Sequence, residues 1–478
     1  MSNRRLHFEE FLYLPALTHE AVIIAWGGFF FEVTTDHDKE KWRLLDADET
    51  EKSVGRRETV GQKSKPYGSQ ARVEVTERGG GSPTVVFSAG ANSAVVTGLK
   101  PDTAYEYRVM VTDETGVERQ WAAGPLHDWV VAAGNMRPGG RYENTFRTFP
   151  DPTQATPSFA FAVIGDFGRG IRQPSADDRC QREVAEALIA AAERHDIRLM
   201  LTTGDNIYAK TLLGIPVSSS GDEDDDWFFT YFQPYRYLIN RLPVFPTVGN
   251  HDAGENEESI DRDQIYDNFY LRTQFARLRE PHESTLAHGL FYRFSFGRDV
   301  EFICLDTSKD DSGKRCFDLP ENSPFLERVF ADPAPTWRIA YSHHPAFCAG
   351  PRHPGSQSLR KFFKAHPEIR VSFSGHEHNF QYARDGGQHH FLTGGGGKFR
   401  TDAPSKNNIA AELCQAWGGN TEGHFLLARI DGKRLEVTPY GHLKQNELRT
   451  IALNPQTNVP FVVEVEEEEQ VASGAHSQ

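Results

Sequence analysis

The chain has 478 residues, against roughly 150 for a typical domain, so its length predicts two or three packed units. Hydrophobic residues make up 38% and charged residues 25%, which predicts soluble globular domains and excludes wholesale disorder. The formal net charge of -15 argues against a nucleic-acid partner, because nucleic acids are themselves polyanions. The longest apolar stretch, residues 21–33, falls short of the roughly 20 residues of a membrane helix, so no membrane span is expected.

The cysteines and the first residues of the chain bear on compartment and on metal chemistry. Five cysteines, an odd number without a CxxC pair, indicate neither a disulfide framework nor a thiolate zinc site. Any metal in this chain must therefore be held by nitrogen and oxygen atoms. The first residues carry charge but no apolar signal core, and no Asn-x-Ser/Thr glycosylation site occurs, so the sequence favours a cytoplasmic protein.

Up to about residue 149, short alternating runs stand between turn-forming clusters, which predicts antiparallel β structure. The expected strands are 21–26, 71–76, 84–87, 94–97 and 105–112. Leu99, Pro101, Thr103 and Tyr105 form a pattern that suits a tyrosine corner, in which a phenol bonds to the upstream backbone. The pattern resembles a fibronectin type III sandwich, and such an accessory domain, with its linker, is expected over residues 1–150.

After a Pro- and Thr-rich segment at 145–158, taken as a linker, the pattern changes to strand, loop, helix, strand. Continuous apolar runs at 159–164 and 197–202 flank an amphipathic helical stripe at 180–194, which predicts an α/β layout with buried strands. Hairpins are expected at 290–306 and 425–437. We expect an α/β domain over residues 151–460 and an acidic, disordered tail over 461–478.

Five apolar runs of this α/β region end in polar groups that can bind a metal ion. The ends read Gly165-Asp166-Phe167-Gly168, Gly204-Asp205-Asn206-Ile207-Tyr208, Gly249-Asn250-His251-Asp252, Ser342-His343-His344-Pro345 and Gly375-His376-Glu377-His378. In open α/β sheets the loops converge at the carboxyl ends of the strands, and ligands collect there. The pattern therefore predicts a metal site at one edge of the sheet.

The donors at these ends are two carboxylates, an amide oxygen, a phenol and three or four imidazoles. This set suits hard or borderline cations such as Fe, Mn, Zn or Mg. Seven ligand groups are too many for one four-coordinate zinc ion and fit two ions if one carboxylate bridges them. Two such ions can activate water and clamp the oxygens of phosphoryl transfer, so no Ser or Cys nucleophile is needed.

The five motifs, in this order, resemble the signature of purple acid phosphatases, which are binuclear metallophosphoesterases. The surroundings of Asp205 and of His376 are most similar to the tartrate-resistant, mammalian-type branch, whereas the leading β region looks like the larger branch typical of plants. The resemblance implies a four-layer α-β-β-α sandwich. It also implies a mostly secreted family, in conflict with the cytoplasmic expectation.

The resemblance further implies a role for each strand-end residue. The first, ferric ion would take Asp166, Asp205, Tyr208 and His378. The second, a divalent Fe, Zn or Mn ion, would take Asn250, His343 and His376 together with the bridging Asp205. His251 would contact phosphate or protonate the leaving oxygen, with Asp252 orienting its ring. His353, in the loop after His343, matches an outer-sphere catalytic histidine.

Two of these positions need a choice between residues. His343 and His344 compete for one ligand position, and Pro345, two residues after His343, favours His343. Gly168 stands where the broader superfamily commonly has a metal-binding histidine, and Tyr208 offers an oxygen donor in its place. A phenolate prefers Fe(III), whose charge lowers the pKa of the phenol and gives a charge-transfer colour.

The resulting prediction is a metal-dependent acid phosphatase that hydrolyses small phosphomonoesters with a hydroxide activated by a binuclear Fe(III)-M(II) centre. One alternative is a phosphodiesterase or nucleotide hydrolase of the same superfamily, because the same ions and His251 serve both reactions. The other is a non-catalytic protein that holds metal while its β-sandwich does the binding.

Overall fold

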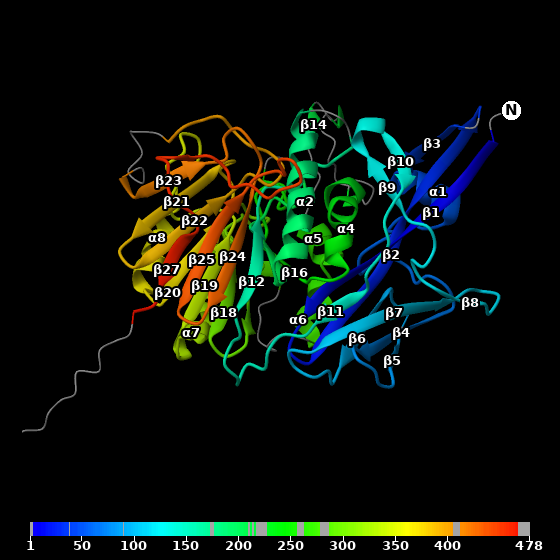
Figure 1. Cartoon of the computed structure of the whole chain (residues 1–478), viewed down its shortest axis with the longest axis horizontal. Helices are drawn as coiled ribbons and strands as arrows, with labels where there is room; N and C mark the ends of the chain where they lie inside the picture. Colours follow the sequence, from blue (N-terminus) through cyan, green and yellow to red (C-terminus); the bar gives the residue numbers. More distant parts are fainter. Residues whose placement is uncertain are drawn as a thin grey trace, which may run out of the picture.

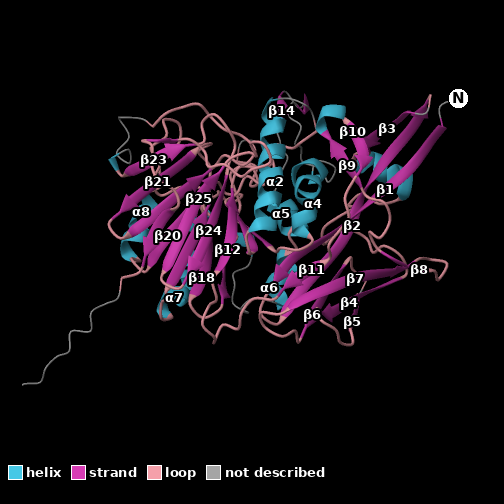
Figure 2. Ribbon diagram, in the orientation of Figure 1, coloured by secondary structure: helices cyan, strands magenta, loops and turns pink. Residues whose placement is uncertain are grey.

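A computed structural model gives the fold of the chain (Figure 1). It describes residues 3–37, 39–88, 90–172, 176–208, 211–212, 215–216, 227–255, 262–277, 286–404 and 412–466. A β-rich N-terminal region lies beside an α/β region, and the helix α2 (Ala176–Arg194) stands between them in this view (Figures 1 and 2). Within the described ranges, no helix is long and apolar enough to cross a membrane.

The N-terminal region contains two main antiparallel sheets. The first has the order β1 (Asn3–Leu17), β2 (Ala21–Asp36) and β3 (Lys39–Leu44), with β6 (Ser93–Thr97) paired to β2. The second has the order β11 (Thr145–Arg147), β7 (Ala104–Thr112), β4 (Gln70–Glu77) and β5 (Thr84–Phe87), with β8 (Glu118–Gln120) paired to β7. The remaining elements here are α1 (Ala47–Val54), the pair β9 (His127–Val130) and β10 (Asn135–Pro138), and a short 3-10 helix between them at Val131–Ala133.

The tyrosine corner has the bond that the sequence pattern predicts. The backbone N–H of Lys100 donates to the Tyr105 hydroxyl at 2.8 Å. The expected linker, in contrast, begins as a strand, because β11 pairs with β7. The two sheets make this a β-rich region, and its likeness to fibronectin type III stays a prediction.

Strand β1 has no counterpart among the strands expected from sequence, which begin at residue 21. Its first half is highly charged, and Phe11, Leu12, Tyr13 and Leu14 in its second half are all buried. A strand buried on both faces shows no apolar–polar alternation, so the period-2 signal fails here. The burial arises because β1 packs against the helices α4 (Gln233–Ile239) and α6 (Leu271–Arg277) and the strand β16 (Val244–Pro246) of the α/β region.

The α/β region contains two sheets that lie face to face. The first has the order β16, β13 (Ile197–Thr202), β12 (Phe159–Ile164), β24 (Phe425–Asp431), β25 (Arg434–Tyr440) and β27 (Phe461–Glu464). The second has the order β17 (Tyr292–Phe296), β18 (Val300–Leu305), β19 (Trp337–Ser342), β20 (Ile369–Ser374), β22 (Gln388–Thr393), β21 (Phe380–Asp385), β23 (Cys414–Gly418) and β26 (Leu453–Asn454). The ring of Phe161 lies edge-on to Phe302 and Phe373, 5.1 and 5.9 Å between centroids, and so joins the sheets.

Helices cover the outer face of each sheet (Figure 2). Leu188 of α2 and Leu238 of α4 line one small apolar cavity with Ala162 and Met200 of the first sheet. The helices α7 (Ser323–Ala331) and α8 (Gln357–Ala365) share a separate apolar cluster with the second sheet. The layers therefore run helix, sheet, sheet, helix. This region also contains α5 (Arg262–Asn268), the hairpin of β14 (Thr211–Leu212) and β15 (Ile215–Pro216), and short helical turns at Phe228–Phe232, Leu286–His288, Cys316–Asp318 and Pro320–Asn322.

The five metal-binding motifs follow β12, β13, β16, β19 and β20. In the first sheet β12, β13 and β16 run parallel, as do β18, β19, β20 and β22 in the second. Their carboxyl ends lie on the same edge, which brings all five motif loops together.

The end of the α/β region extends past residue 460. Strand β27 pairs with β25, so the first residues of the expected tail belong to the sheet. Residues 467–478, which hold the rest of that tail, lie outside the described residues.

Candidate metal centre

The backbone is left-handed at three predicted ligands, with φ of 55° at Asp166, 51° at Asp205 and 72° at His376. Non-glycine residues seldom adopt this conformation, which costs of order 1–3 kcal/mol each and persists where the surrounding structure enforces it. All three stand directly after a glycine at the end of a strand. The turns aim these side chains at the space between the loops.

Two glycines of the motifs are required by close approach. A Cβ at Gly249 would lie 2.1 Å from Oδ1 of Asp205, and a Cβ at Gly375 would lie 2.4 Å from Oδ2 of Asp166. Real Cβ contacts are much longer, so any side chain here displaces a predicted ligand. Glycine is therefore needed at both positions, because a larger residue would collide with a predicted ligand.

One group of donors consists of Asp166, Tyr208 and His378. The Tyr208 hydroxyl lies 3.3 Å from Oδ1 of Asp166 and 3.4 Å from Nε2 of His378, and that nitrogen is 3.4 Å from the same carboxylate oxygen. Ligands about 2.1 Å from one ion lie roughly 3.0 to 3.4 Å from one another in octahedral or tetrahedral coordination. The triangle therefore fits a single cation.

The second group surrounds Nε2 of His343, a wholly buried residue. Oδ1 of Asn250 lies 2.9 Å from this nitrogen, Nδ1 of His376 lies 3.1 Å away and Oδ1 of Asp205 lies 3.4 Å away. The other ring nitrogen, Nδ1, donates to the Thr203 carbonyl at 2.8 Å, so we assign the proton to Nδ1. Lone pairs of nitrogen and oxygen then face one another, an arrangement that a cation stabilises.

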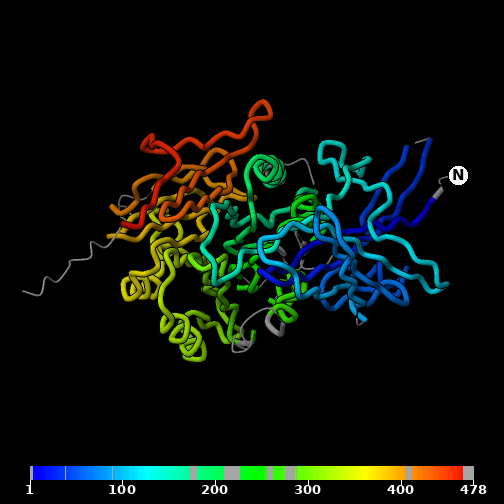
Figure 3. The backbone as a smooth tube through the Cα atoms, turned by 60° about the horizontal axis from the view of Figure 1, so that its bottom comes forward, coloured from blue at the N-terminus to red at the C-terminus, as the bar shows by residue number. Residues whose placement is uncertain are grey.

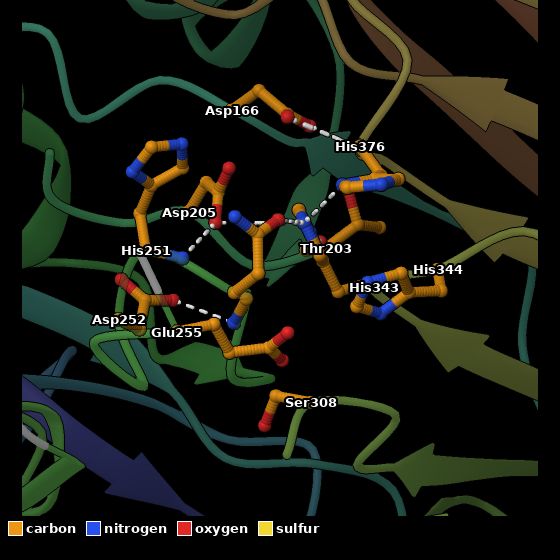
Figure 4. Close-up of polar contacts among 12 residues, drawn as sticks. Asp166, Thr203, Asp205, His251, Asp252, Glu255, Ser308, His343, His344 and His376 are labelled. Atoms are coloured by element: carbon orange, nitrogen blue, oxygen red, sulfur yellow. Dashed lines mark hydrogen bonds and ion pairs between the residues drawn. The ribbon is translucent and has the colours of Figure 1, made fainter. Parts of the chain in front are cut away.

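The two groups meet at the carboxylates (Figure 4). Ligand atoms of Asp166, Asp205 and His343 all lie within 4.8 Å of one another. Burial raises the pKa of the Asp166 carboxyl. Burial acts in the same direction on Asp205, but its interactions with His343 and His251, including the hydrogen bond from the His251 backbone N–H, hold the pKa of that carboxyl below its usual value. All seven predicted ligands thus form one cluster whose donors fit two cations, and their role as ligands stays a prediction.

Gly168 has no room for the histidine found there in the broader superfamily. A Cβ at this position would lie 2.3 Å from the backbone oxygen of Asn206. Because a side chain at residue 168 has no room, no histidine can approach Asp166 from this position. The Tyr208 hydroxyl is the donor that lies beside Asp166 instead. Burial, with the neighbouring carboxylates, raises the pKa of Tyr208 well above its usual value.

A ring nitrogen of His344 also lies within 4.8 Å of ligand atoms of His343 and His376, but both of its ring nitrogens have other partners. Arg315 donates to its Nε2 at 3.1 Å, and its Nδ1 lies 3.0 Å from the Thr307 hydroxyl. Its ring nonetheless lies only 4.3 Å from the His376 ring, centroid to centroid. Between the two competing histidines, the geometry favours His343.

The predicted catalytic histidines flank the cluster. The His251 ring packs on Tyr208, 4.4 Å between centroids, and its backbone N–H donates to Asp205 at 3.0 Å. The His353 ring lies 4.1 Å from that of His376. Burial and the Arg400 guanidinium, which donates to His353 Nε2 at 3.1 Å, lower the pKa of His353.

Asp252 joins two motif loops. Its carboxylate accepts bonds from the backbone N–H groups of Gly249, Asn206 and Ile207 and from the Asn206 side chain, at 2.7 to 3.1 Å. From the sequence, Asp252 is expected to orient the His251 ring. Instead, these hydrogen bonds connect the loop of Asp205 to the loop of Asn250, and so Asp252 fixes the position of Asp205 relative to Asn250.

Two basic side chains lie beside the site, and the sequence did not predict a functional role for them. Lys398 Nζ lies 5.8 Å from the centre of the Tyr208 ring, and Arg400 bonds to His353. Both follow the glycine run 394–397, whose Gly397 N–H donates to the Asp166 carbonyl at 3.0 Å. The only signal in the sequence was two basic residues after this run, which does not indicate what they approach.

Comparison with known proteins defines the class of this domain. Residues 159–380 match the family model of the calcineurin-like phosphoesterases. This part of the α/β region is therefore similar to a calcineurin-like metallophosphoesterase domain, a class that implies phosphoester hydrolysis with divalent metal ions. No curated protein matches the chain.

Two solved structures are similar over most of the chain. Purple acid phosphatase PPD1 from yellow lupin (Lupinus luteus) seeds is 13% identical with a TM-score of 0.58, covering 92% of this chain and 73% of that one. A structure of PhoD is 12% identical with a TM-score of 0.55, covering 93% of this chain and 89% of that one. At such identities the likeness shows the fold alone, and neither supports the mammalian-type branch over another.

Proposed function

We propose that this protein is an acid phosphatase that hydrolyses small phosphomonoesters at a centre of two metal ions, one ferric and one divalent. The observation that carries the proposal is the convergence of donors from five strand ends on the space around Asp205. The phosphoesterase class of the domain agrees with it. The monoester preference and the identity of the ions rest on the resemblance of the motifs to purple acid phosphatases.

Asp166, Tyr208 and His378 would hold the ferric ion, and Asn250, His343 and His376 the divalent ion, with Asp205 between them. When bound, two such ions lower the pKa of a coordinated water and so supply the hydroxide for attack on phosphorus. A trivalent ion at that position would lower the pKa of the Tyr208 phenol, which burial raises in the protein alone, and so allow a phenolate ligand.

The chain's own proton donor would be His251. Its ring packs on Tyr208, and Figure 4 shows it beside Asp205 at the edge of the cluster. His353 is the weaker donor, because its Nε2 already accepts a bond from Arg400 and its pKa is lowered. His353 and Arg400 would instead bind phosphate oxygens or the leaving group through hydrogen bonds.

The Asp205→Asn substitution tests the proposal directly. The amide keeps the shape but removes the charge between the two ions, so turnover of a monoester such as p-nitrophenyl phosphate should fall more than about 100-fold. Metal content should fall with it. Asp385→Asn, at the exposed end of β21, is the matched control and should leave both unchanged.

Rates on paired substrates separate the monoesterase from its alternative. We expect p-nitrophenyl phosphate to be hydrolysed faster than bis(p-nitrophenyl) phosphate. A strong preference for the diester would instead assign the protein as a phosphodiesterase. Full metal content with no hydrolysis of either substrate would favour a protein that only holds metal.

A further inference from the structure

A second group of potential metal ligands lies in the N-terminal region, apart from the site described above. His7 and Glu9 stand two residues apart on β1 and therefore point to the same face of the strand. His127 begins β9, beside β1 and β3 (Figure 1). One ligand atom from each of the three residues falls within 4.8 Å of the other two.

The two imidazoles converge on one carboxylate oxygen. Nε2 of His7 lies 3.0 Å from Oε2 of Glu9, and Nδ1 of His127 lies 3.1 Å from the same atom. These separations match the edges of a tetrahedral zinc site, in which ligands about 2.1 Å from the ion lie roughly 3.4 Å apart. A shift of a few tenths of an ångström would admit the ion.

Hydrogen bonds to the other oxygen of the Glu9 carboxylate, Oε1, fix its orientation toward the two imidazoles. Oε1 of Glu9 accepts a bond from Arg236 at 3.1 Å and one from the His127 backbone N–H at 2.9 Å. The side chains of Glu9 and Arg236 are 1% and 0% exposed. Partners of this kind fix a metal ligand and raise its affinity.

The site is open to an ion on one side and closed on the other. The His7 and His127 side chains are 21% and 22% exposed, which leaves a path for the ion and room for water as a fourth ligand. The Trp42 ring closes the other side, with centroids 4.6 Å from His7 and 4.7 Å from His127.

Two imidazoles and one carboxylate select the class of ion. Zn²⁺ and its neighbours Co²⁺ and Ni²⁺ prefer such nitrogen and oxygen sets, whereas Mg²⁺ and Ca²⁺ require mostly oxygen ligands. Without an ion, both rings donate N–H bonds to Glu9. With an ion, the lone pair of that same nitrogen would face the metal, and each ring would carry its proton on its other nitrogen.

We propose that His7, Glu9 and His127 form a structural site for a divalent ion of the zinc class. The ion would connect β1 to β9. Through the bond between Glu9 and Arg236, it would also connect the N-terminal region to α4 of the phosphoesterase domain. The proposal does not depend on the chemistry of the phosphoesterase site.

Metal counting on the purified full-length protein tests it. After dialysis against a buffered low concentration of free Zn²⁺, the His7→Ala/His127→Ala double variant should contain one zinc ion per chain less than the wild type. The His19→Ala variant is the matched control and should lose none. Asp205→Asn should still bind the ion, which separates this site from the phosphoesterase centre.

Trp42 provides a second readout. Co²⁺ bound beside this ring should quench part of the tryptophan fluorescence, and both the double variant and Trp42→Phe should lack that part. Zn²⁺ should also raise the melting temperature of the wild type more than that of the double variant, because an ion bound only to the folded state stabilises it. Equal zinc content in the wild type and the double variant, with equal quenching, would overturn the proposal.

Discussion

At the scale of single residues, the centre consists of buried acidic groups and imidazoles that are unfavourable together unless cations lie between them. Asp166, Asp205 and Tyr208 bring acidic groups together in a buried space, and His343 adds a lone pair directed at the same point. Buried charges are costly unless they are paired. The left-handed backbone at Asp166 and Asp205 also indicates a functional site, because strain of this kind persists at such sites.

Tyr208→Phe tests the ferric position. Phenylalanine keeps the ring packed against His251 but removes the oxygen donor beside Asp166 and His378. We expect the visible absorption band of the oxidised, iron-loaded protein to disappear, with the far-ultraviolet circular dichroism unchanged. A band that survives the substitution would remove Tyr208 from the ligand set.

Gly249→Ala tests whether loop spacing controls the centre. The added methyl would lie 2.1 Å from Oδ1 and 2.2 Å from the backbone nitrogen of Asp205, so the bridging residue must move. We expect at least one metal ion per chain to be lost and turnover to fall at least about 100-fold. Gly387→Ala, where a Cβ meets nothing within 4 Å and the backbone is not left-handed, is the control for metal content. Undiminished metal in Gly249→Ala would contradict this account of the site.

At the scale of elements, α4 is the connection between the two regions. Its Arg236 is fully buried, bonds to Glu9 and to the His127 carbonyl, and lies over the Phe11 ring at 4.2 Å. All three partners belong to the N-terminal 150 residues. A guanidinium suits this position because it makes several bonds at once and stays charged when buried.

Arg236→Met should therefore destabilise the whole protein. Methionine fills part of the volume but leaves the buried Glu9 without its cation, which typically costs about 3–5 kcal/mol. Urea unfolding followed by tryptophan fluorescence measures the change. Arg182→Met removes an exposed i,i+4 pair with Glu186 on α2 and should cost less than about 1 kcal/mol. Similar losses in the two variants would contradict the role given to Arg236.

At the scale of the whole molecule, the backbones of the N-terminal and phosphoesterase regions lie against each other (Figure 3), and their buried side chains share one hydrophobic core. Phe11 and Phe29 meet Phe228 and Phe232 at 5.3 to 6.0 Å between ring centres. Tyr107 donates to the Asn240 carbonyl at 2.8 Å across the same boundary. Interfaces this apolar and this well bonded resemble the interior of one domain more than a contact between independent ones.

A chain that begins at residue 151 should therefore not fold stably alone. Removal of β1 exposes the apolar faces of α4 and β16, so we expect aggregation, or a broad thermal transition well below that of the full chain. Size-exclusion chromatography and calorimetry provide the measurements. A monomeric 151–478 fragment with a sharp transition and full metal content would instead support an independent accessory domain.

Much of the architecture could be predicted because its signals are local. The strands at 159–164 and 197–202 are continuous apolar runs, and the observed β12 and β13 have the same bounds. The strand β1 could not be predicted in this way, because its burial comes from elements more than 200 residues away. The same holds for Lys398 and Arg400, which are ordinary surface residues until the fold places them beside Tyr208 and His353.

The amino-acid sequence alone determined which donors are present, their order along the chain and the glycines that precede them, because these are properties of short segments. Only the tertiary structure decided that His343 rather than His344 faces Asn250 and Asp205, and that Asp252 clamps two loops. It also decided that Glu9 meets His7, His127 and Arg236. These choices depend on contacts between distant segments, whose energies come from burial and packing that no local pattern records.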